Sequence, residues 1–318
     1  MDWHTYPILR NIKISQKPKK ANNKLITYKN YLYSKYMGWG DYLMTSGHVR
    51  RIKKNKPQIQ VLINNPFNST LFYKHIFYKN PFVTMEQDFN KEKPFIKINR
   101  VESGKIDKLK NKIIWNDERV SEIGDIYSTF DEITFAEKFL NNVMEDWVSK
   151  NKKKPKAIIY ISDLAKKSIK TRNNEQGTEN FLSHFVNKEW GKDNWEEFIR
   201  SIKNEYIIIK SSANGEKNLD NVYTAECDFR TVKAIMDKSD IFIGNEGGLS
   251  HLWATTRKKG IVFFGHWIPP HLTGYSFHLN IKASTNNYCG SLDSCDQCLS
   301  FYKNLSPEFI KYNLDKNI

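Results

Sequence analysis

One stretch of the sequence decides the fold: Ser239-Asp240-Ile241-Phe242-Ile243-Gly244-Asn245-Glu246-Gly247-Gly248-Leu249-Ser250-His251-Leu252. The apolar run 241–243 predicts a buried strand, the glycines indicate a turn, and the residues from about 248 to 256 predict a helix. Strand, glycine loop and helix in this order form the repeating unit of a parallel α/β sheet, which binds ligands beyond the carboxyl ends of its strands. We therefore expect a ligand-binding loop at 244–251.

The rest of the second half repeats this alternation. Strands are predicted at 157–161, 206–209 and 261–264, and helices at about 193–203 and 230–238. Apolar strands that alternate with helices are typical of parallel sheets covered by helices on both faces. The second half is therefore expected to be a Rossmann-like domain.

The first half carries a similar signal. A strand at Tyr31–Tyr36 is expected to pass through a glycine turn into a helix over about 42–54, followed by a strand at 58–63. A lysine-rich linker at 149–156 separates the halves. The sequence thus predicts an α/β protein with two Rossmann-like, parallel-sheet domains, 1–155 and 156–318, facing a central cleft.

Composition narrows the class of protein. Hydrophobic residues make up 39% and charged residues 27% of the 318 residues, which is typical of a water-soluble globular chain. No apolar run approaches the ~18 residues of a membrane span, and the lysine-rich start does not resemble a secretory signal. Four cysteines are too few for a disulfide scaffold. We expect a cytoplasmic protein.

The positive charge is concentrated at one end. Residues 1–60 hold 13 Lys and Arg against two Asp, a net charge of +11 out of the total of +15. Such a field raises the local concentration of an anionic partner: a phosphorylated glycan, an acidic membrane surface or a nucleic acid. Compositional drift in a lysine-rich chain is the alternative explanation, and the asymmetry argues against it.

The first candidate site is Gly38-Trp39-Gly40-Asp41, at a predicted strand-to-helix turn. Glycines permit a close approach of the backbone to a ligand, and amides at the start of a helix favour anions. Asp41 has two interpretations, either a helix N-cap or a general base at the mouth of the cleft.

The second candidate site is the loop before the helix predicted at 248–256. Glu246 and the amides of Gly247 and Gly248 are placed to hold a ribose hydroxyl and a diphosphate, and His251 is placed to face the same phosphates. A capped helix with a structural histidine is an equally good interpretation of the residues alone. Lys188, ahead of another helix, is either a cation for a phosphate oxygen or a solvated lysine.

The third candidate is a cysteine cluster near the C-terminus. Cys289, Cys295 and Cys298 have a spacing that allows zinc binding, with Cys227 or a histidine as a fourth ligand, although reduced cysteines in a loop are the commoner case. The sequence contains no Walker loop, no serine-hydrolase nucleophile elbow and no His-Glu-x-x-His motif. These absences argue against P-loop, hydrolase and metalloprotease functions.

The order of these motifs resembles glycosyltransferase family 9, the ADP-heptose:lipopolysaccharide heptosyltransferase-like enzymes with the two-domain GT-B fold. The resemblance covers about half of the chain and is most specific in the glycine-loop-to-histidine segment. The matching segments are 40–45, 50–53 with Pro57, 80–83, Lys188-x-Trp190, 239–252, 264–265, the three C-terminal cysteines and 306–308.

The resemblance implies an inverting glycosyl transfer without an essential metal ion or other cofactor. Asp41 would deprotonate the acceptor hydroxyl, Lys188 would bind the donor diphosphate, and Glu246, Gly247, Gly248 and His251 would line the donor pocket. The donor would be a nucleotide-diphosphate sugar such as ADP-heptose. The acceptor would be anionic, such as the lipopolysaccharide core at the inner membrane face.

Two other functions remain open from the sequence. One keeps the fold but places the sugar on a modified nucleic-acid base, which in a duplex would have to be flipped out. The other is a non-enzymatic nucleic-acid-binding protein that uses the lysine runs and a cysteine-rich zinc site. The ordered glycine loops favour the enzymes.

Overall fold

A computed structural model describes residues 38–63, 76–99, 101, 103–163, 183–212, 219–284 and 287–318. The helices of this part are α1 (Trp39–Asn55), α3 (Phe130–Asn151), α5 (Lys192–Ile202), α6 (Phe229–Lys238), α7 (Gly248–Ala254), α8 (Pro270–Thr273), α9 (Asp296–Asn304) and α10 (Pro307–Asn317), with 3₁₀ turns at Glu86–Asp88 and Ser183–Lys188. The strands are β1 (Gln60–Ile63), β2 (Phe95–Ile98), β3 (Gly104–Asp107), β4 (Lys112–Trp115), β5 (Ile158–Ser162), β6 (Ile207–Ser212), β7 (Tyr223–Glu226), β8 (Ile241–Asn245), β9 (Gly260–Gly265) and β10 (Leu279–Lys282).

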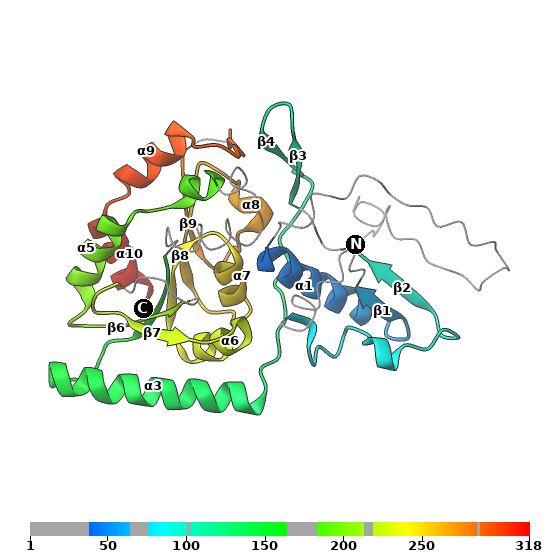
Figure 1. Cartoon of the computed structure of the whole chain (residues 1–318), viewed down its shortest axis with the longest axis horizontal. Helices are drawn as coiled ribbons and strands as arrows, with labels where there is room; N and C mark the ends of the chain where they lie inside the picture. The colour runs from blue at the N-terminus through cyan, green and yellow to red at the C-terminus, as the bar shows by residue number, and fades with distance from the viewer. Residues whose placement is uncertain are drawn as a thin grey trace.

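The second half is a six-stranded parallel sheet with the order β10-β9-β8-β5-β6-β7 (Figure 1). Within this half, the first strand along the chain is the central strand β5. Strands β6 and β7 follow on one side of it, and the chain then crosses over to form β8, β9 and β10 on the other side. This is the classic doubly wound order, whose topological switch point lies between the first and fourth strands. Here those strands are β5 and β8.

Alternating side chains of the strands point to opposite faces of the sheet and pack in two separate cores. Ile159, Ile161 and Ile243 pack with residues of α5 and α10 on one face, whereas Tyr160 and Phe242 pack with residues of α6 and α7 on the other. Both faces are covered, so the strands consist of nearly continuous apolar residues instead of alternating polar and apolar ones. The strands and helices predicted for the second half are confirmed to within a few residues.

Helix α3 lies along the sheet domain. A capping box fixes its start, because Thr129 Oγ1 accepts from the Glu132 amide while the Glu132 carboxylate accepts from the Thr129 amide. Its buried face packs on α6, and Trp147 Nε1 donates to the Lys203 carbonyl. A helix on the first side of the predicted linker therefore packs against the second half.

The first half contains α1, the parallel pair β1–β2 and the antiparallel hairpin β3–β4 (Figure 1). The hairpin was not predicted. The strand expected at 31–36 and the basic extension at 1–30 lie outside the described residues, so a complete Rossmann-like first domain stays a prediction. Among the described helices, none is both long and apolar enough to cross a membrane.

Candidate functional site

The carboxyl ends of β5 and β8 mark the place where a doubly wound sheet binds its ligand. Glu246 follows β8 directly and is held by a backbone bond from its amide to the Phe263 carbonyl. Beside it, both polar side-chain atoms of Asn245 are buried without a hydrogen-bond partner among the described residues. A water molecule or a polar ligand at this position would satisfy them.

Lys188 and Glu246 form a buried ion pair at this position. Lys188 Nζ donates to Glu246 Oε2, and the ammonium also lies 4.1 Å from the centre of the Trp267 ring. Burial opposes ionisation of Glu246, but the Lys188 charge and His251 outweigh it and hold the pKa of that carboxyl well below its ordinary value. The solvated-lysine interpretation is therefore wrong for Lys188.

His251 extends the cluster from the first turns of α7. Its Nε2 lies 3.7 Å from Glu246 Oε1, and its Nδ1 lies 2.8 Å from the hydroxyl of Tyr275. The Tyr275 hydroxyl also donates to the Glu122 carbonyl, at 3.4 Å, and so is able to accept from Nδ1. Nε2 therefore faces the carboxylate of Glu246, and Nδ1 faces the hydroxyl of Tyr275.

Asp41 lies in the first turn of α1. The N-cap of this helix is Gly38, without a side-chain cap bond, and Asp41 is the third helical residue, so the cap interpretation is wrong. Ser103 Oγ donates to Asp41 Oδ1 at 3.4 Å, and Arg119 Nη1 lies 3.9 Å from the same oxygen. Arg119 Nη1 donates to Ser103 Oγ at 2.5 Å, so the three side chains form one unit.

Arg119 is a buried cation near charged groups of both halves. Its side chain is 3% exposed, and burial lowers its pKa, while the nearby Asp41, Tyr275, Glu122 and Glu246 oppose that shift. Sequence reasoning missed Arg119 and Tyr275, because neither belongs to a motif that was singled out. A search for a cation able to neutralise clustered buried carboxylates is the signal that could have found Arg119.

The two halves meet closely at two glycines. A Cβ on Gly40 would lie 2.3 Å from His251 Cδ2, and a Cβ on Gly248 would lie 3.2 Å from Trp39 Cβ. Helices α1 and α7 therefore pack with almost no side chain between their first turns. This places the Asp41 turn beside the loop that carries Glu246 and His251, the juxtaposition that the sequence led us to expect.

Of the remaining predicted loop residues, Trp39 and Gly247 have structural partners, whereas Gly38 is exposed. The Trp39 ring stacks on Phe229, with centroids 4.4 Å apart. The Gly247 amide donates to Ser250 Oγ at 3.0 Å and so already has an acceptor within its own turn. Gly38 is exposed, with open space where a Cβ would be.

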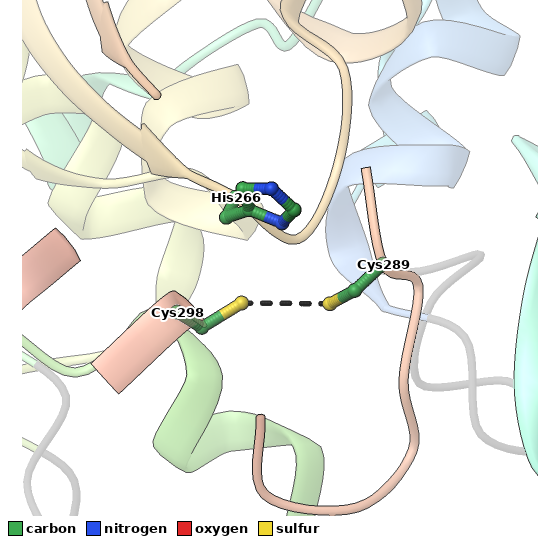
Figure 2. A group of neighbouring side chains, drawn as sticks. All are labelled: His266, Cys289 and Cys298. Carbon is green, nitrogen blue, oxygen red and sulfur yellow. Dashed lines mark hydrogen bonds between the residues drawn. The ribbon is translucent and has the colours of Figure 1, made fainter. Parts of the chain in front are cut away.

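The cysteine cluster also assembles in the structure. His266, Cys289 and Cys298 bring their ligand atoms within 4.8 Å of one another, and the two sulfurs are 3.5 Å apart (Figure 2). The hydrogen bond from Cys298 lowers the pKa of Cys289 to about 5. Cys295 interacts with both thiols, but neither Cys295 nor Cys227 belongs to the group of three whose ligand atoms lie this close. Thiolate and imidazole donors suit zinc or iron.

Several cations at the basic end have partners within the protein. Arg50 pairs with Asp125, Arg51 with Glu122 at 2.8 Å, and Lys53 donates to the carbonyls of Pro57 and Ile59. These charges hold α1 to the rest of the molecule. An anionic partner would depend more on the basic residues 1–37, which lie outside the described part.

Comparisons with known proteins are informative at the level of structure. No protein-family model matches the sequence, and no curated protein matches it. A glycosyl transferase of family 9 from Veillonella parvula aligns over 88% of this chain and 94% of its own, with 11% identity and a TM-score of 0.53. The iron-containing dodecameric glycosyltransferase TibC from enterotoxigenic Escherichia coli aligns over 88% and 74%, with 12% identity and a TM-score of 0.51.

A third structure matches only in part. The Escherichia coli heptosyltransferase WaaC with ADP aligns over 57% of this chain, at 15% identity and a TM-score of 0.36, and the match spans about half (48%) of the WaaC chain. The two alignments that cover 88% of this chain support the conclusion. The chain has the heptosyltransferase-like α/β fold of glycosyltransferase family 9, and its neighbours in structure are GT-B glycosyltransferases.

Proposed function

We propose that this protein is an inverting glycosyltransferase that moves a sugar from a nucleotide-diphosphate donor to an anionic acceptor. The observation that supports the proposal is the close packing of α1 on α7, which sets the Asp41 turn beside the loop that carries Glu246 and His251. A carboxylate on the first half and cations on the second are the two parts that a direct displacement needs.

The donor would bind at the carboxyl ends of β5 and β8. The Lys188 ammonium is held at this position by Glu246, and it would contact the donor diphosphate while the Glu246 carboxylate accepts from ribose hydroxyls. His251 and the amide of Gly248 would complete the pocket with Gly247. We take ADP-heptose as the donor, on the resemblance of the sequence motifs to the heptosyltransferases.

The chemistry would be a single displacement. Asp41 would take the proton of an acceptor hydroxyl as its oxygen attacks the anomeric carbon. The bond from that carbon to the diphosphate oxygen would break, and the diphosphate would leave with the electron pair. Lys188 and His251 would stabilise its charge, so the reaction would need no added divalent cation.

The acceptor side would lie on residues 1–155, and the donor side on 156–318, facing each other as the two domains of a GT-B enzyme. Trp39 and Gly40, with Gly38, would shape the acceptor side beside Asp41. The basic end would favour an anionic glycan such as the lipopolysaccharide core, presented at the cytoplasmic face of the inner membrane. Closure of the halves would exclude water and suppress hydrolysis of the donor.

A thermal-shift screen of nucleotide sugars tests the donor. A ligand that binds only the folded state raises the unfolding temperature, and we expect ADP-sugars to do so. Lys188→Met should abolish this shift, because the diphosphate loses its cation. Lys192→Met serves as the control, since Lys192 is an exposed lysine nearby, paired with Glu196.

Asp41→Asn tests the proposed base. We expect it to keep the donor-induced thermal shift and to lose at least about 100-fold in transfer, the usual range for a general base. Asp131→Asn, in the first turn of α3, is the matched control and should transfer normally. Undiminished transfer by Asp41→Asn would show that Asp41 is not the base. Transfer to nucleic acid instead of glycan would show that the acceptor is a nucleic acid.

A further inference from the structure

We propose that Tyr275 is a positioning residue, which holds the ring of His251 toward the donor site only while the two halves of the molecule are packed together. This role rests on the proposed function, in which His251 stabilises the departing diphosphate, and it adds a residue outside the motifs. Tyr275 acts through His251 and takes its own position from the first half of the chain.

The ring of His251 is held on two sides and faces the donor site on a third. Its Nδ1 lies 2.8 Å from the hydroxyl of Tyr275, and the two rings meet edge to face with centroids 5.7 Å apart. The backbone of Gly40 packs against Cδ2, where a Cβ would lie only 2.3 Å away. Nε2 is left 3.7 Å from Glu246 Oε1. A ring flip would lose the contact at Nδ1, so Nε2 stays directed at the proposed diphosphate position.

The contacts that hold this ring belong to the first half of the chain or are fixed by it. Gly40 is part of α1. Tyr275 lies in the second half, but its hydroxyl is also 3.4 Å from the carbonyl oxygen of Glu122 in the first half. Next to it, Ser121 Oγ donates to the carbonyl of Gly274. The Tyr275 hydroxyl thus bridges a histidine of the donor site and a main-chain group of the other half.

The turn that follows α8 fixes the position of Tyr275 at the junction of the halves (Figure 1). Glycine is required at 274, because a Cβ there would lie 2.5 Å from the Pro270 carbonyl oxygen. The Tyr275 carbonyl accepts from the His278 amide at 3.1 Å and from Asn280 Nδ2 at 3.0 Å. The tyrosine is only 5% exposed. A turn bonded in this way delivers the hydroxyl to one place.

The chemistry of the hydroxyl suits a bridge between two polar groups. Burial raises the pKa of Tyr275, so the hydroxyl stays protonated at neutral pH and is able both to donate and to accept. If the halves separate, the hydroxyl loses Glu122 and the His251 ring loses Gly40. The histidine is then free to turn away from the diphosphate, so the packed arrangement is the one that favours transfer.

Nitrogen NMR of the full-length, ligand-free protein tests how the ring is held. Tyr275→Phe removes the hydroxyl and keeps the aromatic ring, so we expect the Nδ1 signal of His251, assigned by its loss in His251→Asn, to move. Ser121→Ala removes the neighbouring bond between the halves and should move the same signal to a smaller extent. Tyr206→Phe is the control, because it loses a similarly buried hydroxyl that donates to Asp315 at 2.7 Å.

Transfer kinetics show whether the hydroxyl acts through the histidine. We expect Tyr275→Phe to lower kcat about three- to tenfold, the rate equivalent of one neutral hydrogen bond, and to leave the KM of the donor within about twofold. The reason is that His251 acts on charge that appears as the diphosphate leaves. In a His251→Ala background, Tyr275→Phe should have almost no further effect, because the residue through which it acts is gone.

The outcomes separate this role from a merely structural one and from the proposed function. The proposal is overturned by an unchanged His251 signal in Tyr275→Phe, or by an equal loss of kcat with and without His251, since a structural hydroxyl acts additively. An unchanged signal in Ser121→Ala would overturn the coupling to the first half. Failure of the wild-type protein to transfer from any nucleotide sugar would contradict the proposed function, whereas the placement of the ring is decided by the NMR measurement alone.

Discussion

At the scale of single residues, the interior of this protein is organised by paired charges. Glu122 accepts from Arg51 Nη2 at 2.8 Å and lies 3.2 Å from His48 Nδ1, and its backbone carbonyl accepts from Tyr275. Burial alone would favour its neutral form, but the bonds to His48 and Arg51 lower the pKa of Glu122 to about 2. Glu122 therefore stabilises the fold only while it is ionised.

The sign of the resulting pH dependence follows from the lowered pKa. The stabilisation by Glu122 is complete above its ordinary pKa of 4.5 and is lost as the pH falls toward about 2. At neutral pH it amounts to at most about 3.5 kcal/mol, since each pKa unit corresponds to about 1.4 kcal/mol. We expect Glu122→Gln to lower the free energy of unfolding at pH 6 and to make a much smaller difference at pH 2.5.

Urea unfolding at pH 6 and pH 2.5 measures the change in the free energy of unfolding caused by Glu122→Gln. Glu118→Gln, in which an exposed carboxylate is neutralised nearby, is the control and should change little at either pH. If Glu122→Gln lowers the free energy of unfolding equally at pH 2.5 and pH 6, the stabilisation by Glu122 does not depend on its ionisation.

At the scale of secondary-structure elements, the packing of α1 on α7 depends on two glycines, which have no side chain to hold the helices apart. Gly40 faces the His251 ring, and Gly248 faces Trp39. Because both glycines lie in first helical turns, the two helix starts approach each other more closely than side chains would permit. The approach is what brings Asp41 beside the Glu246 loop.

Gly40→Ala should therefore destabilise the protein. The added Cβ, 2.3 Å from His251 Cδ2, has to displace a buried ring, which costs about 1–3 kcal/mol or more. Gly247→Ala is the matched control, because a Cβ there meets no atom within 4 Å. The unfolding temperatures of the two variants, measured by heating, test this expectation. Equal unfolding temperatures would show that α1 and α7 can move apart without loss of stability.

At the scale of the whole molecule, α3 belongs in space with the second half. Its buried side chains Ala136, Leu140, Val143 and Trp147 face the sheet domain, and Arg230 of α6 pairs with Glu132 at 2.7 Å. A domain boundary at residue 155 separates this helix from the surface that it covers. The linker at 149–156 thus follows an element that is already docked.

Two fragments test where the second domain begins. We expect residues 128–318 to unfold cooperatively, and residues 156–318 to be less stable and more prone to aggregate, because the α6 face would be exposed without α3. Circular dichroism during heating compares them. Equal stability of the two fragments would instead support an independent domain that starts at the linker.

Much of the second half could be predicted from the sequence, because its signals are local. The run Ile241–Ile243 and the glycines that follow it fix a strand, a turn and a helix from neighbouring residues alone. The same patterns located Glu246, His251 and Lys188. The hairpin β3–β4 was missed because β3, Gly-Lys-Ile-Asp, holds a single apolar residue and the connection at 108–111 contains no glycine turn signal.

The sequence by itself determined the doubly wound sheet and the loop at its switch point, since strand and helix periodicities act over a few residues. Only the tertiary structure decided that Arg119 packs beside Asp41 and Ser103, that Tyr275 contacts the ring of His251, and that His266 joins Cys289 and Cys298. These contacts join residues far apart in the chain, and they depend on how closely glycines let the elements approach, which no local pattern records.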